Sequence, residues 1–560
     1  MNDARSSVFV KLALSLEWYH IPLAIAISIP AWIIYNLFFH PLAKYPGPFI
    51  ARIGIPGIWP FWQTYNYRFA WALEEAHDRY GEVVRISTNH LSFNTSKAAQ
   101  QIYAHGSGVI YPKTTFYQSF QVYRKQPSLF SEIDSDKHSA FRRAISGAYS
   151  MNNLIKLEEY IEPLTQNFIK RLSENQATTE KGSVVIDLAK WLHFFAMDAV
   201  GELAFGASFG FVEKGNDADN FLVGVSNLSH WGSMAGWLPA ISRPLRKWIK
   251  YSSGQPGGET VGKVTEPLIN ERYRLLDIQS KKDETKMTKE ELDDIARLDA
   301  RQDMLSNFCK SKNPTTGNLL QRNEVLRTAI SVVSAGSDTS ATALTTMIGY
   351  LVRNPEVHKA LQKEIDDAFD AGALTWPIQY AQAVKLELLQ ACIKETLRLH
   401  PPISMSLPRE VCTKDGLVVQ GHVGKQHIVP FGCQVSVAPF VLHRNKDEFG
   451  ENAREYDPYR WLNLSEDKRR NLEKSILTFG GGARQCIGKN ISLMEINKAL
   501  PSLIRTFDFK LPDRSSNDWQ GRDSDGVEAE QVPWRCRSTW FLEVQTFPVQ
   551  ITTRSNGDDD

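Results

Sequence analysis

A glycine-rich stretch near the C-terminal end constrains the fold more than any other feature of the chain. It reads Phe-Gly-Gly-Gly-Ala-Arg-Gln-Cys-Ile-Gly over residues 479–488. Three consecutive glycines do not suit the interior of a helix or a strand, because glycine loses more backbone entropy on folding than other residues. They suit a tight loop whose backbone lies against a flat surface. A helical pattern of apolar residues follows Cys486 directly and continues to residue 507.

The position of Cys486 favours a reactive thiolate. A cysteine at a helix N-terminus lies at the positive end of the backbone dipoles, and Arg484 is two residues away. No second cysteine or histidine lies nearby, so the stretch is a poor zinc site, which needs about four ligands. A lone thiolate suits a metal whose other positions are filled, as in haem, where it favours cleavage of the O–O bond. A buried structural cysteine is the alternative.

This stretch resembles the haem-binding loop of the cytochrome P-450 superfamily of haem-thiolate monooxygenases, Phe-x-x-Gly-x-Arg-x-Cys-x-Gly. The chain matches the pattern at Phe479, Gly482, Arg484, Cys486 and Gly488. The resemblance implies that Cys486 is the axial ligand of the iron in haem b, iron protoporphyrin IX. It also implies that Phe479 and Gly488 bind the cofactor and that Arg484 contacts a propionate. The expected fold is mainly α with a small β region, with haem between a long oxygen-binding helix and the cysteine loop.

The overall composition is balanced in charge. The 560 residues include 64 basic and 63 acidic side chains, a net charge of +1, which provides no basic face for nucleic acid. Hydrophobic residues make up 42% of the chain, enough for a sizeable core. The six cysteines are scattered without a Cys-x-x-Cys pair, which fits a reducing compartment.

An uncharged apolar segment at residues 21–39 predicts a membrane anchor. Nineteen helical residues reach roughly 28 Å, close to the apolar thickness of a bilayer. A cleaved signal peptide is the alternative, but bulky residues rather than small ones follow the segment. Lys44, Arg52 and Arg68 come next, before any acidic residue, which predicts a cytosolic C-terminal side. We therefore expect a single-pass protein of the endoplasmic reticulum membrane with a cytosolic catalytic domain.

The chain divides into four expected parts. Residues 1–40 hold the anchor, and residues 41–67 form a proline-rich hinge similar to that of microsomal members of the superfamily. Residues 68–554 form the haem-thiolate catalytic domain, and residues 555–560 form a disordered tail.

Local patterns near the start of the catalytic domain predict a helix over 69–80 and a hairpin over 81–93. Residues 105–130 have no period. They correspond to a loop that the superfamily uses as a substrate lid, and a plain surface connection is the alternative.

The longest amphipathic pattern predicts a helix over residues 323–354, capped by Asn323 and ended by Pro355. Its centre reads Ala-Gly-Ser-Asp-Thr over 335–339, four residues of which disfavour a helix interior and so predict a loosened turn. The stretch matches the oxygen-binding pattern Ala/Gly-Gly-x-Asp/Glu-Thr of the superfamily. The resemblance implies that Thr339 hydrogen-bonds dioxygen and that Asp338 relays protons. A solvated surface charge is the alternative for Asp338.

Two further arginines are candidate partners of the haem propionates. Members of the superfamily usually have Trp-x-x-x-Arg at the start of one helix, whereas this chain has His138 and Arg142. Arg142 is expected on a propionate, since a guanidinium fits a carboxylate with two parallel hydrogen bonds, and His138 is a less defined contact. A solvent-facing arginine is the alternative. Residues 403–409 are expected to cross the haem, with Arg409 reaching a propionate.

A third motif predicts a buried charge network. Glu395 and Arg398 are three residues apart on one helix, so they share a face. The pair falls between the oxygen helix and the haem loop, as in the superfamily, and Arg460 provides the third member. The superfamily more often has Pro-Glu-Arg where this chain has Pro-Tyr-Arg, so Tyr459 is a departure. The network is expected to fix the segment that leads to Cys486.

The resemblance implies a monooxygenase that inserts one oxygen atom of O2 into a hydrophobic small molecule. The chain has no flavin or nicotinamide motif, so electrons are expected from an NADPH–cytochrome reductase, with cytochrome b5 as a second candidate donor. The pattern around residues 138–150 is similar to fungal members in specialised-metabolite pathways. A haem-thiolate isomerase or dehydratase and a haem sensor without turnover are the alternatives. The Asp338–Thr339 pair argues against both, because neither needs a proton relay.

Overall fold

A computed structural model describes most of the chain. The described residues are 20–103, 109–121, 126–177, 183–217, 220–242, 244, 257–280, 288–300, 303–421, 424–512 and 534–554. The start of the expected N-terminal part and the expected tail at 555–560 lie outside these ranges.

Helices form most of the described structure. They are α2 (His20–Ile34), α3 (Phe49–Ile53), α4 (Ile58–Tyr65), α5 (Phe69–Tyr80), α6 (Ser96–Tyr103), α7 (Ser135–Ile145), α8 (Met151–Ala177), α9 (Leu188–Phe205), α10 (Phe211–Lys214), α11 (Phe221–Trp237), α13 (Gly257–Ser280), α14 (Lys289–Ala300), α15 (Met304–Lys310), α16 (Arg322–Arg353), α17 (Pro355–Asp370), α18 (Tyr380–Ala383), α19 (Glu387–Leu399), α20 (Pro439–Leu442), α21 (Lys446–Phe449), α22 (Glu466–Lys474) and α23 (Lys489–Thr506). Short 3₁₀ segments are η2 (Thr115–Phe120), η3 (Ser146–Tyr149), η6 (Pro458–Trp461) and η7 (Gly482–Arg484).

The strands form small sheets. They are β1 (Val83–Ser87), β2 (His90–Phe93), β3 (Ser183–Asp187), β4 (Arg409–Glu410), β5 (Leu417–Gln420), β6 (Gln426–Val429), β7 (Gln434–Val437), β8 (Phe507–Lys510), β9 (Arg535–Ser538), β10 (Leu542–Thr546) and β11 (Pro548–Thr553). The largest has the order β1-β2-β7-β4, in which β2 and β7 are parallel and the other pairs antiparallel. The predicted mainly α fold with a small β region is confirmed.

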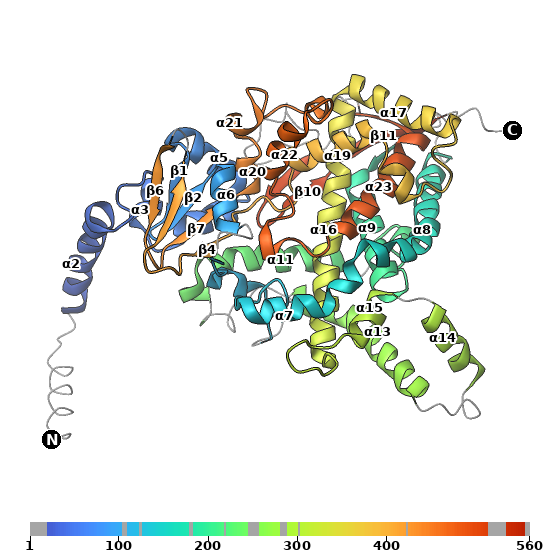
Figure 1. The fold of residues 1–560 in the computed structure, drawn as a ribbon, viewed down its shortest axis with the longest axis horizontal. Helices are drawn as coiled ribbons and strands as arrows, with labels where there is room; N and C mark the ends of the chain where they lie inside the picture. The colour runs from blue at the N-terminus through green and yellow to red at the C-terminus, as the bar shows by residue number, and fades with distance from the viewer. Residues whose placement is uncertain are drawn as a thin grey trace.

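Helix α16 runs through the middle of the molecule and organises the helical body (Figure 1). It packs along α9 and also contacts α13, α19 and α23. Its C-terminal half buries Leu344, Met347, Ile348 and Leu351, which recur at the spacing of one helix face. The sheet of β1, β2 and β7 lies at the opposite end from α14, on the side of the N-terminal helix α2.

The cap of α16 differs from the prediction. The helix begins at Arg322, and the residue before it, Gln321, occupies the N-cap position instead of Asn323. The backbone N–H of Gln321 donates to Oε2 of Glu324 at 2.9 Å. A glutamate three residues after the cap satisfies a backbone donor that would otherwise be free, which sets the helix start.

The apolar N-terminal segment forms a shorter α-helix than the predicted anchor. Helix α2 ends at Ile34 and the chain continues as a π-helical turn, η1 (Tyr35–Phe39). The guanidinium of Arg85 donates to the carbonyl oxygen of Asn36 at 2.8 Å, which ties this turn to strand β1. Among the described residues, no helix combines the length and the apolar character that crossing a membrane requires.

Candidate functional site

The loop before Cys486 folds back on itself through its glycines. Gly480 and Gly482 have φ values of 70° and 62°, which side chains other than glycine rarely adopt. The turn returns the chain so that the backbone N–H of Cys486 donates to the carbonyl oxygen of Phe479 at 2.8 Å. Helix α23 begins three residues later, with Gly488 at its N-cap position. A Cβ atom at Gly488 would lie 3.9 Å from the sulfur of Cys486.

The side chain of Cys486 is exposed, but it lies deep among protein atoms rather than on the outside of the molecule. Both statements hold for a side chain that faces an internal space. Burial raises the pKa of Cys486, while the backbone N–H groups of Gly488 and Lys489 and the charge of Arg142 lower it. The expected dipole and cation effects are present, but burial outweighs them in the protein alone.

Arg484 was predicted to be the cation that favours the thiolate of Cys486, but its guanidinium is directed elsewhere. Its guanidinium donates to the carbonyl oxygens of Glu132 at 2.6 Å and Ile133 at 3.3 Å. Arg142 takes its place near the sulfur, and its Nη1 donates to the carbonyl oxygen of Gln485 at 2.7 Å. Sequence distance alone therefore identified the wrong arginine as the neighbour of Cys486.

The centre of α16 stays helical across the stretch that was predicted to loosen. Thr339 Oγ1 donates to the carbonyl oxygen of Ala335 at 2.8 Å, one turn back. Gly336 is needed for a different reason, since a Cβ atom there would lie 2.7 Å from a methyl group of Val200 on α9. Ala335 is exposed and Thr339 half-buried on this otherwise buried helix, so the turn borders an open space.

Asp338 is buried, which excludes a solvated surface charge. Its pKa is raised to about 7, mainly by burial; the charge of His193 lowers it, the negative charge of Glu543 raises it, and Ser337 lowers it. Its Oδ1 lies 3.8 Å from Nε2 of His193. Its Oδ2 is buried without a hydrogen-bond partner among the described residues. At neutral pH this carboxyl group therefore holds a proton much of the time.

A group of cations lies on the other side of the cysteine loop. The pKa of His138 is lowered to about 3 by burial, the largest cause, together with four positive charges. In order of effect these charges belong to Arg484, Lys113, Arg142 and Arg409. The structure thus brings together all four residues that were predicted as propionate contacts.

Lys113 belongs to this group and was missed by the sequence analysis. It is buried, and its Nζ donates to the carbonyl oxygen of Phe130 at 2.5 Å and lies 4.3 Å from the ring centroid of Tyr117. Burial, followed by the charges of Arg409 and Arg484, lowers its pKa well below the usual range. The residue lies in an aromatic stretch without a helix or strand period, so no local pattern marked it.

The composition of this cation group fits haem. Within the described ranges, Lys113, Arg142, Arg409 and Arg484 form no ion pair with a carboxylate. Buried charges without partners are costly, so the group is suited to an anionic ligand. Haem b carries two propionate carboxylates, and its iron accepts a cysteine thiolate as a ligand, which is the kind of donor that Cys486 offers.

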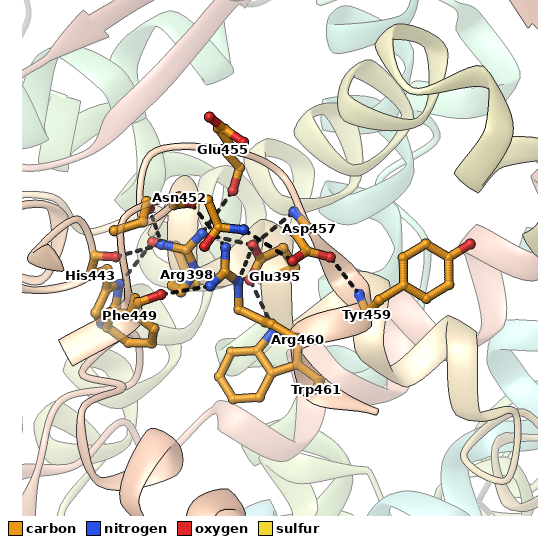
Figure 2. A network of polar contacts seen from close by, with 11 residues as sticks. Glu395, Arg398, His443, Phe449, Asn452, Glu455, Asp457, Tyr459, Arg460 and Trp461 are labelled. Atoms are coloured by element: carbon orange, nitrogen blue, oxygen red, sulfur yellow. Dashed lines mark hydrogen bonds and ion pairs between the residues drawn. The ribbon is translucent and has the colours of Figure 1, made fainter. Parts of the chain in front are cut away.

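Glu395 is the centre of a buried polar network (Figure 2). Nη2 and Nε of Arg398 lie 2.7 and 2.9 Å from its carboxylate oxygens, and Nε of Arg460 lies 2.8 Å away. The indole N–H of Trp461 and the backbone N–H of Asp457 also donate to it, at 2.9 and 3.0 Å. The carboxylate and Arg398 are fully buried, so the charges depend on one another.

The two arginines extend the network over the segment 443–461. Arg398 donates to the carbonyl oxygen of His443 at 2.6 Å, and Arg460 donates to that of Phe449 at 2.8 Å. Tyr459 points away from Glu395 and is half exposed, which explains why the chain tolerates tyrosine there (Figure 2).

His443 connects this network to the cysteine loop. Its Nε2 accepts from the backbone N–H of Leu477 at 2.7 Å. Two residues later the chain enters the glycine loop at Phe479.

Comparison with known proteins agrees with this geometry. The family model for Cytochrome P450 matches residues 52–527. Among curated relatives, pisatin demethylase of Fusarium vanettenii is 31% identical over 90% of this chain and 91% of its own length. Cytochrome P450 monooxygenase cicH of Emericella nidulans is 30% identical over 92% and 94%. Cytochrome P450 monooxygenase gsfF of Penicillium aethiopicum is 31% identical over 88% and 93%. The chain is a member of the cytochrome P450 family.

Proposed function

We propose that this chain is a haem-dependent monooxygenase that inserts one oxygen atom of O2 into a hydrophobic small molecule in a fungal secondary-metabolite pathway. The observation that carries the proposal is the pairing of a loop thiol, Cys486, with a group of buried and half-buried cations that forms no ion pair with a carboxylate in the described structure. The relatives named as fungal monooxygenases support the reaction class and the pathway type.

The haem is held from two sides in this proposal. Cys486 would bind the iron through its sulfur, and Arg142, Arg409, Arg484 and Lys113 would neutralise the propionates. Phe479 packs beside the loop, where Nζ of Lys489 lies 5.5 Å from its ring centroid. Gly488 leaves room next to the sulfur, and His138 stays neutral among the cations because its pKa is about 3.

When bound, haem supplies the activation of dioxygen. The chain supplies the protons for that activation. The carboxyl group of Asp338 can hold and give up a proton near neutral pH, since its pKa is about 7. The hydroxyl group of Thr339 lies next along α16 and is half-buried at the open turn, where it donates to the carbonyl oxygen of Ala335. By turning away from that oxygen, the hydroxyl group would donate its hydrogen bond into the open space instead.

The electrons come from a separate NADPH–cytochrome reductase, with cytochrome b5 as an additional donor, because the chain carries no flavin or nicotinamide motif. The substrate is hydrophobic in this proposal. Aromatic side chains of η2 and of the turn before β10 gather near Lys113, and Phe120 and Trp540 lie 5.3 Å apart between ring centroids.

Membrane association through the N-terminal segment is the last part of the proposal. Ile27, Phe38 and Phe39 are 63%, 72% and 71% exposed, and apolar side chains of this size are rarely left in water together. Lys44 and Arg52 follow this segment, which favours a cytosolic catalytic domain at the endoplasmic reticulum membrane.

Thiolate ligation is tested by spectroscopy. The reduced protein with carbon monoxide should show the strongly red-shifted Soret band of a haem thiolate, and Cys486→His should lose it while retaining haem. A folded, haem-loaded wild-type protein without this band would rule out the proposal. Product formation with reductase, NADPH and O2 separates a monooxygenase from a haem sensor and from an isomerase.

If Lys113 binds a propionate, replacing it should have opposite effects on the stability of the haem-free protein and on its affinity for haem. Lys113→Met should stabilise the haem-free protein, because it removes a buried amine whose charged form is disfavoured by burial and by the neighbouring Arg409 and Arg484. The same change should weaken haem binding by roughly 10- to 100-fold, the value of about one charged hydrogen bond. Thermal unfolding and haem titration measure the two effects. Lys137→Met, at an exposed lysine of α7, is the control. Unchanged haem affinity in Lys113→Met would contradict the role.

The Glu395 network is tested by removing its carboxylate. Glu395→Ala leaves two buried arginines unpaired, which should cost about 3–5 kcal/mol and yield protein without haem. Haem content per polypeptide is the measurement. Glu473→Ala is the matched control, because that carboxylate forms an exposed ion pair with Lys394 on the same helix, α19. Normal haem content in Glu395→Ala would refute the proposed role.

Membrane association is tested by truncation. A variant starting at residue 34 keeps Asn36 and its contact with Arg85, so the catalytic domain should retain its carbon monoxide spectrum. The full chain should sediment with microsomes after a high-salt wash, and the truncated variant should move to the supernatant. Full-length protein that is already in the supernatant would contradict the anchor.

A further inference from the structure

A histidine on the neighbouring helix faces the acid of the oxygen helix. His193 lies on α9, which packs along α16 through the close approach at Gly336. Its Nε2 is 3.8 Å from Oδ1 of Asp338, and the two side chains are 12% and 4% exposed. No sequence pattern singled out His193, because the contact joins residues far apart in the chain.

The other ring nitrogen fixes which form of His193 faces the acid. Nδ1 lies 2.9 Å from the carbonyl oxygen of Ala189. A carbonyl oxygen can only accept, so Nδ1 carries the hydrogen and donates it. In the neutral imidazole, Nε2 is then unprotonated and turns its lone pair toward Asp338.

This arrangement complements a protonated carboxyl group. Burial favours the neutral form of Asp338, which can donate its O–H to Nε2 after a small rotation or through one water. The second oxygen, Oδ2, is buried without a partner among the described residues, so it is free to pass a proton onward. Oδ1 is thus the oxygen that exchanges a proton with His193, and Oδ2 is the oxygen left for an onward transfer.

Two carboxyl groups of the described structure lie on elements next to this part of α16. Glu543 on β10 acts on it through its negative charge and accepts hydrogen bonds from Ser226 of α11 at 3.0 Å. Glu495 on α23 is buried and interacts with Ser340, two residues along α16 from Asp338. Of the groups that act on Asp338, His193 is the one that can carry a positive charge.

We propose that His193 returns a proton to Asp338 after each proton that Asp338 gives up, and that it holds the carboxyl group toward α9. The transfer is balanced, since imidazolium and carboxylate become neutral imidazole and neutral acid, and the ring regains its proton from solvent. His193 acts through Asp338 and is therefore a positioning residue. The inference rests on the proposed monooxygenase function.

A first test follows the proton directly by infrared titration of the purified protein. The carbonyl band of a protonated carboxyl group that disappears in Asp338→Asn belongs to Asp338. This band should be lost as the pH rises through about 7. In His193→Gln its midpoint should move upward, equivalent to an increase of at least about threefold in proton affinity, because the imidazolium no longer favours the carboxylate. An unchanged midpoint overturns the inference.

A second test measures how well electrons are used. With reductase, NADPH and 7-ethoxycoumarin as the probe substrate, His193→Gln should release at least about three times more hydrogen peroxide per NADPH than the wild type, because Asp338 is reprotonated slowly. Turnover supported by added hydrogen peroxide, which brings its own protons, should stay unchanged. His358→Gln on α17 is the matched control, since that histidine is buried but does not act on Asp338.

The outcomes separate the two proposals. A wild-type protein without the carbon monoxide band contradicts the haem-thiolate function itself. A wild type with that band, together with a His193→Gln variant that matches it in peroxide release, contradicts only the role of His193. If 7-ethoxycoumarin is not turned over, the infrared midpoint alone decides the question.

Discussion

The rest of the site depends on the ion pairs and hydrogen bonds that the carboxylate of Glu395 forms. The carboxylate is fully buried and accepts from Arg398, Arg460, Trp461 and the backbone of Asp457. Removing this carboxylate would leave the two arginines without their ion pair. Through His443 the network continues to Leu477, just before the glycine loop. The sulfur of Cys486 is therefore positioned by a charge cluster in another part of the chain.

The two sides of the site hold buried ionisable groups of opposite kind. On one side, Lys113 and Arg409 are buried cations whose contacts are ring faces, a hydroxyl and carbonyl oxygens. On the other side, Asp338 is a buried acid that burial keeps protonated near neutral pH. In the proposed function, the propionates of haem would neutralise the first side. The second side has Glu543 and His193 as neighbours, and a proton moving between His193 and Asp338 would change its charge.

The parts of the site that follow from local sequence were predicted, and the parts made by distant contacts were not. The helix over 69–80 and the hairpin over 81–93 are α5 and β1–β2, because their periodicity is local. The neighbour of Cys486 was misidentified, since Arg484 turns to the carbonyl oxygen of Glu132. Lys113 and His193 belong to no sequence motif. Each could be recognised only from its contact with a residue far away in the sequence.

Gly336 shows how one residue can have a local and a distant explanation. Its low helix propensity predicted a loosened turn, yet α16 is continuous there. The missing side chain instead lets α9 approach, since a Cβ atom would lie 2.7 Å from Val200. The same close approach brings His193 within 3.8 Å of Asp338. A larger residue at this position would separate the two helices, and the proton partner of Asp338 would move away with α9.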